Sequence, residues 1–162
     1  MSVKRIVIDA STALKWTLRD EEPSSQADAL LDDLLAGRLS VLVPTIFDYE
    51  ITNVLKVATS RKRLSADEAK MALEKFKFYA IARIDFPPLQ DLTFQLALKH
   101  DRSAYDSAYV ALARYLGVWL FTADRRLFNA VGSALDYVKW IGDYQFEAIP
   151  DAEDAETPTQ SG

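Results

Sequence analysis

Short apolar segments alternate with amphipathic helical segments along almost the entire chain, and this alternation limits the fold more than any other feature. The apolar segments are rich in β-branched residues and bounded by turn residues, as buried strands are. We predict strands at residues 3–8, 41–43, 81–86, 118–122 and 137–141, and helices at 13–16, 27–35, 46–60, 65–79, 89–99, 105–116 and 126–131. Strands that alternate with helices form a mainly parallel sheet covered on both faces. The sequence therefore predicts a three-layer α/β/α sandwich.

Several helix ends carry recognisable signals. Ser65 and Glu68 have the spacing of a capping box, and Gly117 is a typical residue to end the helix at 105–116. Ser11 or Thr12 is expected to cap the first short helix. The helix at 46–60 is expected to bury a stripe that consists of Ile46, Tyr49, Val54, Val57 and Ala58.

Composition excludes several kinds of chemistry. The 162 residues include no cysteine and a single histidine, His100, which rules out disulfides, thiolate catalysis and a multi-histidine zinc site. With 49% apolar and 27% charged residues, the chain is typical of neither a disordered nor a membrane protein. No apolar run approaches the roughly 20 residues of a spanning helix, and no signal peptide is evident. We expect a cytoplasmic protein whose chemistry rests on carboxylates and hydroxyls.

The negative charge is concentrated at the C-terminus. The net charge is −5, and removing residues 151–162 changes it to −1, because that segment carries four carboxylates and neither Lys nor Arg. A segment this polar cannot bury enough surface to offset its ordering entropy. We therefore predict one domain at residues 1–146, followed by an acidic, disordered tail at 147–162. A nearly neutral body leaves a nucleic-acid partner open, because local patches decide that question.

Four acids stand where an α/β site would need them. Asp9 and Asp124 directly follow the first and fourth predicted strands, and ligands of such sheets bind beyond the carboxyl ends of strands. Glu50 and Asp106 lie inside apolar helical stretches, where charged residues are rare unless they are paired. Supporting polar candidates lie nearby in the sequence, namely Ser11, Thr122 and Asn53.

Each acid also has an ordinary structural explanation. Asp9 and Asp124 could cap the helices that follow them, Glu50 could lie on a solvated helix face, and Asp106 could favour a helix dipole. The four acids taken together, in this order and on this fold, favour a functional site.

The acids fall in segments that match a known family. These segments are Ile8-Asp9-Ala10-Ser11, Pro44 with Glu50 and Asn53, Tyr105-Asp106, Leu116-Gly117-Val118, and Phe121-Thr122-Ala123-Asp124-Arg125-Arg126-Leu127. With them the chain resembles the PIN-domain ribonucleases, and within these the VapC toxins of VapBC-type toxin–antitoxin pairs, over residues 3–142. The resemblance implies a five-stranded parallel sheet between helices, and its acidic positions fall on Asp9, Glu50, Asp106 and Asp124.

Clustered carboxylates repel one another unless a cation neutralises them, and oxygen donors suit Mg²⁺ or Mn²⁺. The resemblance implies a divalent-metal endoribonuclease in which an activated water attacks the phosphodiester. Asp9 and Asp106 are the expected direct ligands, and Glu50 and Asp124 would complete the shell. The hydroxyls of Ser11 and Thr122 would orient the carboxylates or a water.

Partners also follow from the resemblance. It implies an RNA substrate, a VapB-like antitoxin and a homodimer. Arg125, Arg126 and Lys15 could hold RNA phosphates, although ordinary solvated charge is an equally good explanation. The run at 61–63 is expected to be a solvated turn, and His100 a surface residue rather than a general base.

Other readings of the same residues remain. A haloacid-dehalogenase-type phosphotransferase needs a second Asp at the position of Ser11, and a response-regulator receiver needs an acidic pair where Ala10 follows Asp9. The serious alternative is a non-catalytic PIN-like module that binds RNA or protein, for which loss of one of the four acids would argue. The RNA, the number of metal ions and the identity of the antitoxin stay open.

Overall fold

The computed structural model describes residues 3–19, 25–85 and 87–151, and it contains the predicted alternation of strands and helices. The strands are β1 (Lys4–Ile8), β2 (Leu39–Pro44), β3 (Ile81–Ile84), β4 (Trp119–Thr122) and β5 (Val138–Trp140). The helices are α1 (Ala10–Leu14), α2 (Ser25–Leu35), α3 (Ile46–Ser60), α4 (Ala66–Phe78), α5 (Pro87–His100), α6 (Ala104–Leu116) and α7 (Arg125–Val131). Two 3₁₀ turns follow, at Ile141–Asp143 and Phe146–Ala148.

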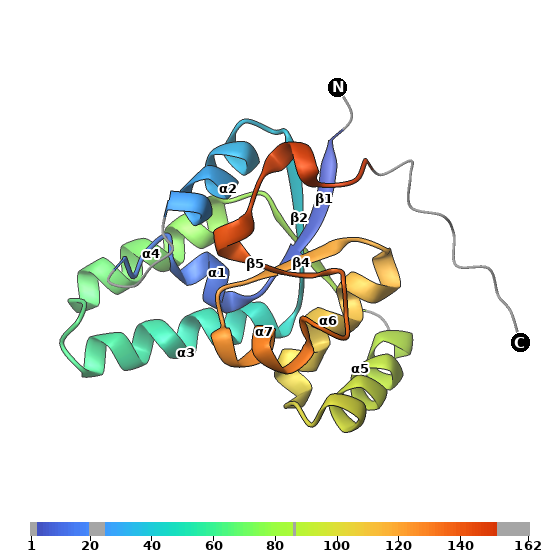
Figure 1. The fold of residues 1–162 in the computed structure, drawn as a ribbon. Coiled ribbons are helices and arrows are strands. Elements are labelled where there is room, and N and C mark those ends of the chain that lie inside the picture. Colours follow the sequence, from blue (N-terminus) through green and yellow to red (C-terminus); the bar gives the residue numbers. More distant parts are fainter. Residues whose placement is uncertain (1–2, 20–24, 86, 152–162) are drawn as a thin grey trace, which may run out of the picture.

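The five strands form one parallel sheet in the order β3-β2-β1-β4-β5, which confirms the predicted α/β sandwich. The chain first builds outward from β1 through β2 to β3, and then returns to add β4 and β5 on the other side of β1. Figure 1 shows α2, α3 and α4 on one side of this sheet and α5 and α6 on the other. The reversal creates a topological switch point between β1 and β4, where ligands of open α/β sheets bind.

The core lies between the sheet and its two helical layers. The inner strands are apolar where they are fully buried, at residues 6–8, 41–44 and 120–121, as expected for a parallel sheet covered on both faces. Helix α6 is the most apolar helix against the sheet, with a buried run from Tyr109 to Ala113. Asp106 lies one turn before this buried run in the same helix, which is an unusual position for a charged side chain.

Two of the predicted helix signals are confirmed and one is wrong. Ser65 and Glu68 form a reciprocal capping box, and Gly117 ends α6 in the left-handed conformation with a φ of 65°. The first helix, however, is capped by Asp9, whose side chain accepts from the backbone amide of Thr12. Neither Ser11 nor Thr12 caps it, because the helix begins one turn earlier than the sequence suggested, directly after β1.

The predicted buried stripe of α3 is displaced around the helix. Tyr49 is 76% exposed, and Ile46, Val54 and Val57 are half-buried rather than central to the core. The buried residues are Phe47, Ile51, Leu55 and Ala58. The helix is apolar on two adjacent faces, so periodicity alone could not choose between them. The Phe47 ring packs edge-on against Phe76 of α4, which fixes the rotation.

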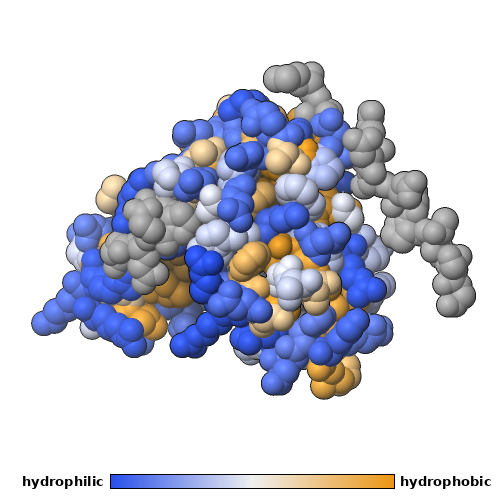
Figure 2. All heavy atoms as spheres, viewed as in Figure 1, coloured by the Kyte–Doolittle hydropathy of each residue, from blue (hydrophilic) through white to orange (hydrophobic). Residues whose placement is uncertain are grey.

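The C-terminal segment packs against the start of the sheet. Ile149 is buried, and its carbonyl accepts from Nζ of Lys4 at 2.6 Å, so residues that were assigned to the tail contact the body. The remainder of the predicted tail, 152–162, lies outside the described residues. Within the described chain, no helix has both the length and the hydrophobicity to cross a bilayer. Figure 2 shows a mostly hydrophilic surface with apolar residues in separate patches.

Candidate functional site

Asp9 lies at the carboxyl end of β1, beside the end of β4, because Ile8 pairs with Phe121 in the sheet. Its carboxylate is 5% exposed and is held by hydrogen-bond donors on both oxygens. Oδ1 accepts from Oγ of Ser11 at 2.6 Å and from the Thr12 amide at 3.0 Å. Oδ2 accepts from Oγ1 of Thr122 at 2.5 Å. This carboxylate is therefore fixed at the switch point of the sheet.

The two hydroxyls that hold Asp9 also tie the end of β4 to the end of β1. Oγ of Ser11 accepts from the Ala123 amide and Oγ1 of Thr122 accepts from the Asp124 amide, each at 3.0 Å. The Asp124 carboxylate in turn caps α7, since its Oδ1 accepts from the amides of Arg126 and Leu127. Asp124 therefore caps α7, as its ordinary structural explanation predicted. The cap also holds this acid at the same edge of the sheet as Asp9.

Glu50 enters from α3, in the second turn after β2. Its Oε1 is buried and makes no hydrogen bond of standard geometry, and the same is true of Oη of Tyr109 on α6. The Tyr109 hydroxyl nevertheless lies near enough to lower the pKa of the Glu50 carboxyl. The Glu50 carboxyl on α3 and the Tyr109 hydroxyl on α6 are thus neighbours, and each has a buried oxygen without a hydrogen bond of standard geometry.

Asp106 lies in the first turn of α6, whose N-cap Ser103 accepts from the Asp106 amide at 3.0 Å. Oδ2 of Asp106 is 3.7 Å from Nη2 of Arg102. Position 106 matches the helix-dipole explanation, but the side chain is half-buried and paired, so it is not a freely solvated helix-end acid.

Three of the four carboxylates, Asp9, Glu50 and Asp106, have a raised pKa, and other members of the set contribute to each shift although they come from separate parts of the sequence. Burial, together with the nearby charge of Asp124, raises the pKa of Asp9 to about 6 against the donors that lower it. Burial and the charges of Asp9 and Asp106 raise the pKa of Glu50 above its usual value. Burial and Asp124 raise the pKa of Asp106, which Arg102 lowers in part. The fold therefore gathers four partly or fully buried acids into one electrostatic cluster.

The donor set of this cluster fits a hard divalent cation. Carboxylate and hydroxyl oxygens are the ligands that Mg²⁺ and Mn²⁺ prefer, and a cation would relieve the mutual repulsion. The unpartnered Oε1 of Glu50 is an orphaned acceptor in the same place. No three Asp, Glu or His side chains of the described residues lie close enough for a ready-made metal site. Mg²⁺ keeps several of its waters, so part of this shell can be reached through water.

The other residues that the sequence analysis considered for the site or for RNA binding lie in positions less suited to those roles. Asn53 is exposed and forms no hydrogen bond with the other candidates in the described chain. Lys15 is only 7% exposed at the end of α1. Arg125 and Arg126 are both exposed, and the Arg125 guanidinium lies over the Trp140 ring at 3.7 Å from its centroid. His100 is half-buried at the end of α5 rather than at the surface.

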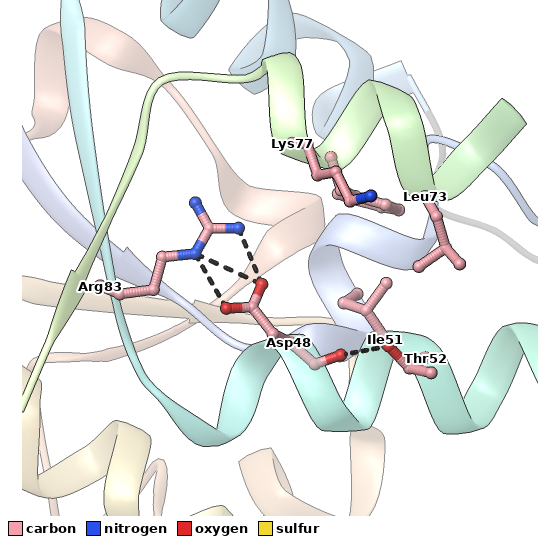
Figure 3. A pocket seen from close by; sticks show the side chains of 7 residues that line it. Asp48, Ile51, Thr52, Leu73, Lys77 and Arg83 are labelled. Atoms are coloured by element: carbon pink, nitrogen blue, oxygen red, sulfur yellow. Dashed lines mark hydrogen bonds and ion pairs between the residues drawn. The ribbon is translucent and has the colours of Figure 1, made fainter. Parts of the chain in front are cut away.

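Asp48 is an acid of α3 that lies outside the cluster and is paired with an arginine instead. It is two residues from Glu50 and therefore on the other side of α3. Figure 3 shows it turned toward Arg83, with which it forms a two-pronged ion pair, at 2.8 Å from Nη2 and 3.1 Å from Nε. The pair borders a pocket of about 380 Å³ between α3 and α4, where Lys77 and Phe76 also lie. Asp48 is thus an exposed, paired acid outside the cluster.

Two residues of the site were not selected from the sequence. Tyr109 lies three positions after Asp106 and so shares its side of α6; a tyrosine in a buried helix needs a partner for its hydroxyl, and that was the available signal. Arg102 lies two residues before α6, the helix that carries Asp106. A basic residue four positions before a candidate acid has the spacing of an ion pair.

The doubly wound parallel sheet and the acidic cluster at its switch point define an α/β protein with a carboxylate site suited to a divalent cation. Residues 6–133 match the family model of the PIN domain, and the chain belongs to that family. It is 38% identical to Ribonuclease VapC9 of Mycobacterium tuberculosis, over 75% of this chain and 87% of that one. It is 36% identical to Ribonuclease VapC3 of Pyrobaculum aerophilum, over 76% and 92% of the two chains. The resemblance to VapC ribonucleases is thereby confirmed.

Solved structures share the fold at low sequence identity. The crystal structure of PAE2754 from Pyrobaculum aerophilum matches with a TM-score of 0.63 and 22% identity, over 88% of this chain and 93% of that one. VapC20 of Mycobacterium tuberculosis, described as a sarcin–ricin loop cleaving toxin, gives a TM-score of 0.55 at 14% identity, over 78% and 95%. VapBC2 of Rickettsia felis, solved with a DNA fragment from its promoter, gives 0.58 at 11% identity, over 84% and 98%.

Proposed function

We propose that this protein is a divalent-metal-dependent endoribonuclease and the toxin of a type II toxin–antitoxin pair. The observation that carries the proposal is the cluster of Asp9, Glu50, Asp106 and Asp124 at the switch point of the sheet, in which burial and neighbouring carboxylates raise the pKa of Asp9, Glu50 and Asp106. Such a concentration of negative charge is costly without a cation and is typical of catalytic rather than structural sites. The VapC names of the relatives support RNA as the substrate.

The protein's own residues hold one of the proposed oxygen ligands, Asp9, in a fixed position. Ser11, Thr12 and Thr122 hold both oxygens of Asp9 in place, so this carboxylate needs no rearrangement to bind. We assign Asp9 and Asp106 as the direct metal ligands, with Glu50 and Asp124 completing the shell directly or through water. A bound Mg²⁺ or Mn²⁺ would polarise the scissile phosphate and lower the pKa of an attacking water. The Glu50 carboxylate, whose pKa is raised by burial, could accept a proton from that water.

The proposed partners rest on the relatives and on exposed surface. Toxin–antitoxin complexes from Klebsiella pneumoniae and Rickettsia felis share the fold, which supports a VapB-like antitoxin as partner. Phe94 and Leu98 of α5 are exposed one helical turn apart, and an apolar strip of this kind suits a homodimer contact.

The decisive experiment compares isosteric variants of the acids with a matched control. Asp9→Asn, Glu50→Gln, Asp106→Asn and Asp124→Asn should each reduce Mn²⁺-dependent cleavage of a mixed RNA pool by at least about 100-fold. Asn is as good a helix cap as Asp, so the changes at 9 and 124 preserve the local fold. Asp48→Asn, an acid on the same helix as Glu50 but paired with Arg83, should keep full activity.

EDTA should abolish cleavage by the unmodified protein, and Mn²⁺ should restore it. If the protein binds no Mn²⁺ and cleaves no RNA, the non-catalytic binding module becomes the better description. Full activity in the Asp9→Asn variant would rule out the assigned metal site.

A further inference from the structure

Arg102 occupies a turn whose backbone is fixed on both sides. Helix α5 ends with Asp101 in the left-handed conformation at a φ of 51°, and the Arg102 amide donates to the Ala97 carbonyl at 3.1 Å. These are the features of a Schellman motif, which ends a helix in a defined direction. One residue later, Ser103 caps α6. The Arg102 side chain is thus directed at the acidic cluster by two helix ends.

The guanidinium of Arg102 is only weakly engaged. Its Nη2 is 3.7 Å from Oδ2 of Asp106, which is long for a charged hydrogen bond. Its Nε is buried and has no hydrogen-bond partner, although the side chain as a whole is 29% exposed. A buried donor without a partner is unfavourable and calls for an explanation. A guanidinium whose anionic partner is a ligand would have this geometry while the ligand is not bound.

Any polyanion that reaches the cluster must approach four carboxylates. A cation at the edge of the cluster would offset this repulsion, and a planar guanidinium matches the geometry of a phosphate. Of the other basic candidates, Arg125 lies over a ring and Lys15 is buried, and Arg126 is exposed, whereas Arg102 is placed directly against one of the four acids. We propose that Arg102 leaves its loose contact with Asp106 and binds a phosphate of the single-stranded RNA substrate. This inference rests on the proposed ribonuclease function.

The test measures RNA binding rather than cleavage. Arg102→Ala and Arg102→Lys are placed in the Asp9→Asn background, so that the RNA stays intact. Binding of a fluorescein-labelled single-stranded RNA 12-mer of mixed sequence is followed by anisotropy at a series of salt concentrations. Arg114→Ala is the control, because Arg114 is an exposed arginine in the last turn of α6, about 15 Å along the axis from the first residue of that helix, which Arg102 precedes.

Loss of one phosphate contact should weaken binding about tenfold or more with Arg102→Ala and lower the slope of log K against log salt by about 0.7. Arg102→Lys should restore part of the affinity, and Arg114→Ala should change neither quantity. Mn²⁺ affinity of Arg102→Ala in the otherwise unmodified protein should stay equal or increase, because Asp106 loses a competing cation.

The result that overturns the inference is an unchanged RNA affinity and salt slope in a folded Arg102→Ala variant. A lower melting temperature with an unchanged slope would likewise assign Arg102 a purely structural role. Failure of the proposed function is a separate outcome, since it would appear as absence of Mn²⁺-dependent cleavage by the unmodified protein.

Discussion

Tyr109 contacts Glu50 and is the clearest case of a residue that positions a proposed metal ligand. The two side chains face each other across α3 and α6, each with a buried oxygen that makes no regular hydrogen bond. Removing the hydroxyl with Tyr109→Phe keeps the ring volume, so the fold should be retained. Residues that orient metal ligands typically contribute 10- to 100-fold to affinity or activity. We expect Mn²⁺ affinity and turnover to fall by about 10-fold in this variant.

A double-mutant cycle shows whether Tyr109 acts through Glu50. In a Glu50→Gln background, Tyr109→Phe should cause little further loss, because the interacting partner is already changed. Equal losses in both backgrounds, measured by Mn²⁺ binding, would mean that Tyr109 supports the site in some other way.

The buried charge of Asp9 should make stability depend on pH. Its pKa is about 6 in the folded protein and 3.8 without the fold's influence, so the native state binds its proton more tightly. Stability without metal should therefore fall as pH rises from about 4 to about 6, and the loss should be complete above that range. A shift of about two units corresponds to about 3 kcal/mol.

The variant Asp9→Asn should consequently unfold at a higher urea concentration than the unmodified protein at pH 7.5 in EDTA, by up to about 3 kcal/mol. At pH 4 the difference should nearly vanish. Asp48→Asn, at an exposed carboxylate, should follow the unmodified protein at both pH values. Parallel stability curves for Asp9→Asn and the unmodified protein would contradict a destabilising charge at this position.

Elements were predicted well where the signal is local. The limits of α3 and the capping box of α4 follow from residues next to each other in sequence, and both are present. The face that α3 buries depends on Phe76, which lies in another helix, so it could not be read from α3 alone. The start of α1 depends on how β1 ends against β4, and the predicted cap was accordingly misplaced.

The same distinction applies to the site. The acids Asp9 and Asp124 could be selected from sequence, because the ends of strands identify the binding edge of a parallel sheet. That Glu50 and Asp106 reach this edge depends on the packing of α3 and α6 around the sheet. The contribution of Tyr109 comes from a contact between α3 and α6, which no single segment encodes, whereas Arg102 lies in a local turn four residues before Asp106 and could have been selected by that spacing.

At the scale of the whole molecule, the carboxyl edge and the amino edge of the sheet, where the strands end and begin, differ in function. The carboxyl edge holds the acidic cluster, whereas the amino edge is closed by the C-terminal segment. There, Oη of Tyr144 donates to Oδ2 of buried Asp33 at 2.6 Å, and Arg38 forms an ion pair with the same carboxylate. The Phe146 ring lies under the charged groups of Lys4 and Arg38.

This separation predicts opposite effects of two conservative changes. Tyr144→Phe leaves the buried Asp33 carboxylate with one donor fewer and should lower the unfolding free energy by about 1–3 kcal/mol in urea denaturation. Its cleavage activity below the unfolding transition should be unchanged, because the variant keeps the ring that packs against Phe121 and removes only the hydroxyl, which contacts Asp33 and none of the four acids of the site. Asp9→Asn should do the reverse, with activity lost and metal-free stability gained. If Tyr144→Phe impaired cleavage in the fully folded state, the two edges would be coupled, and stability and catalysis could not be assigned to separate ends of the sheet.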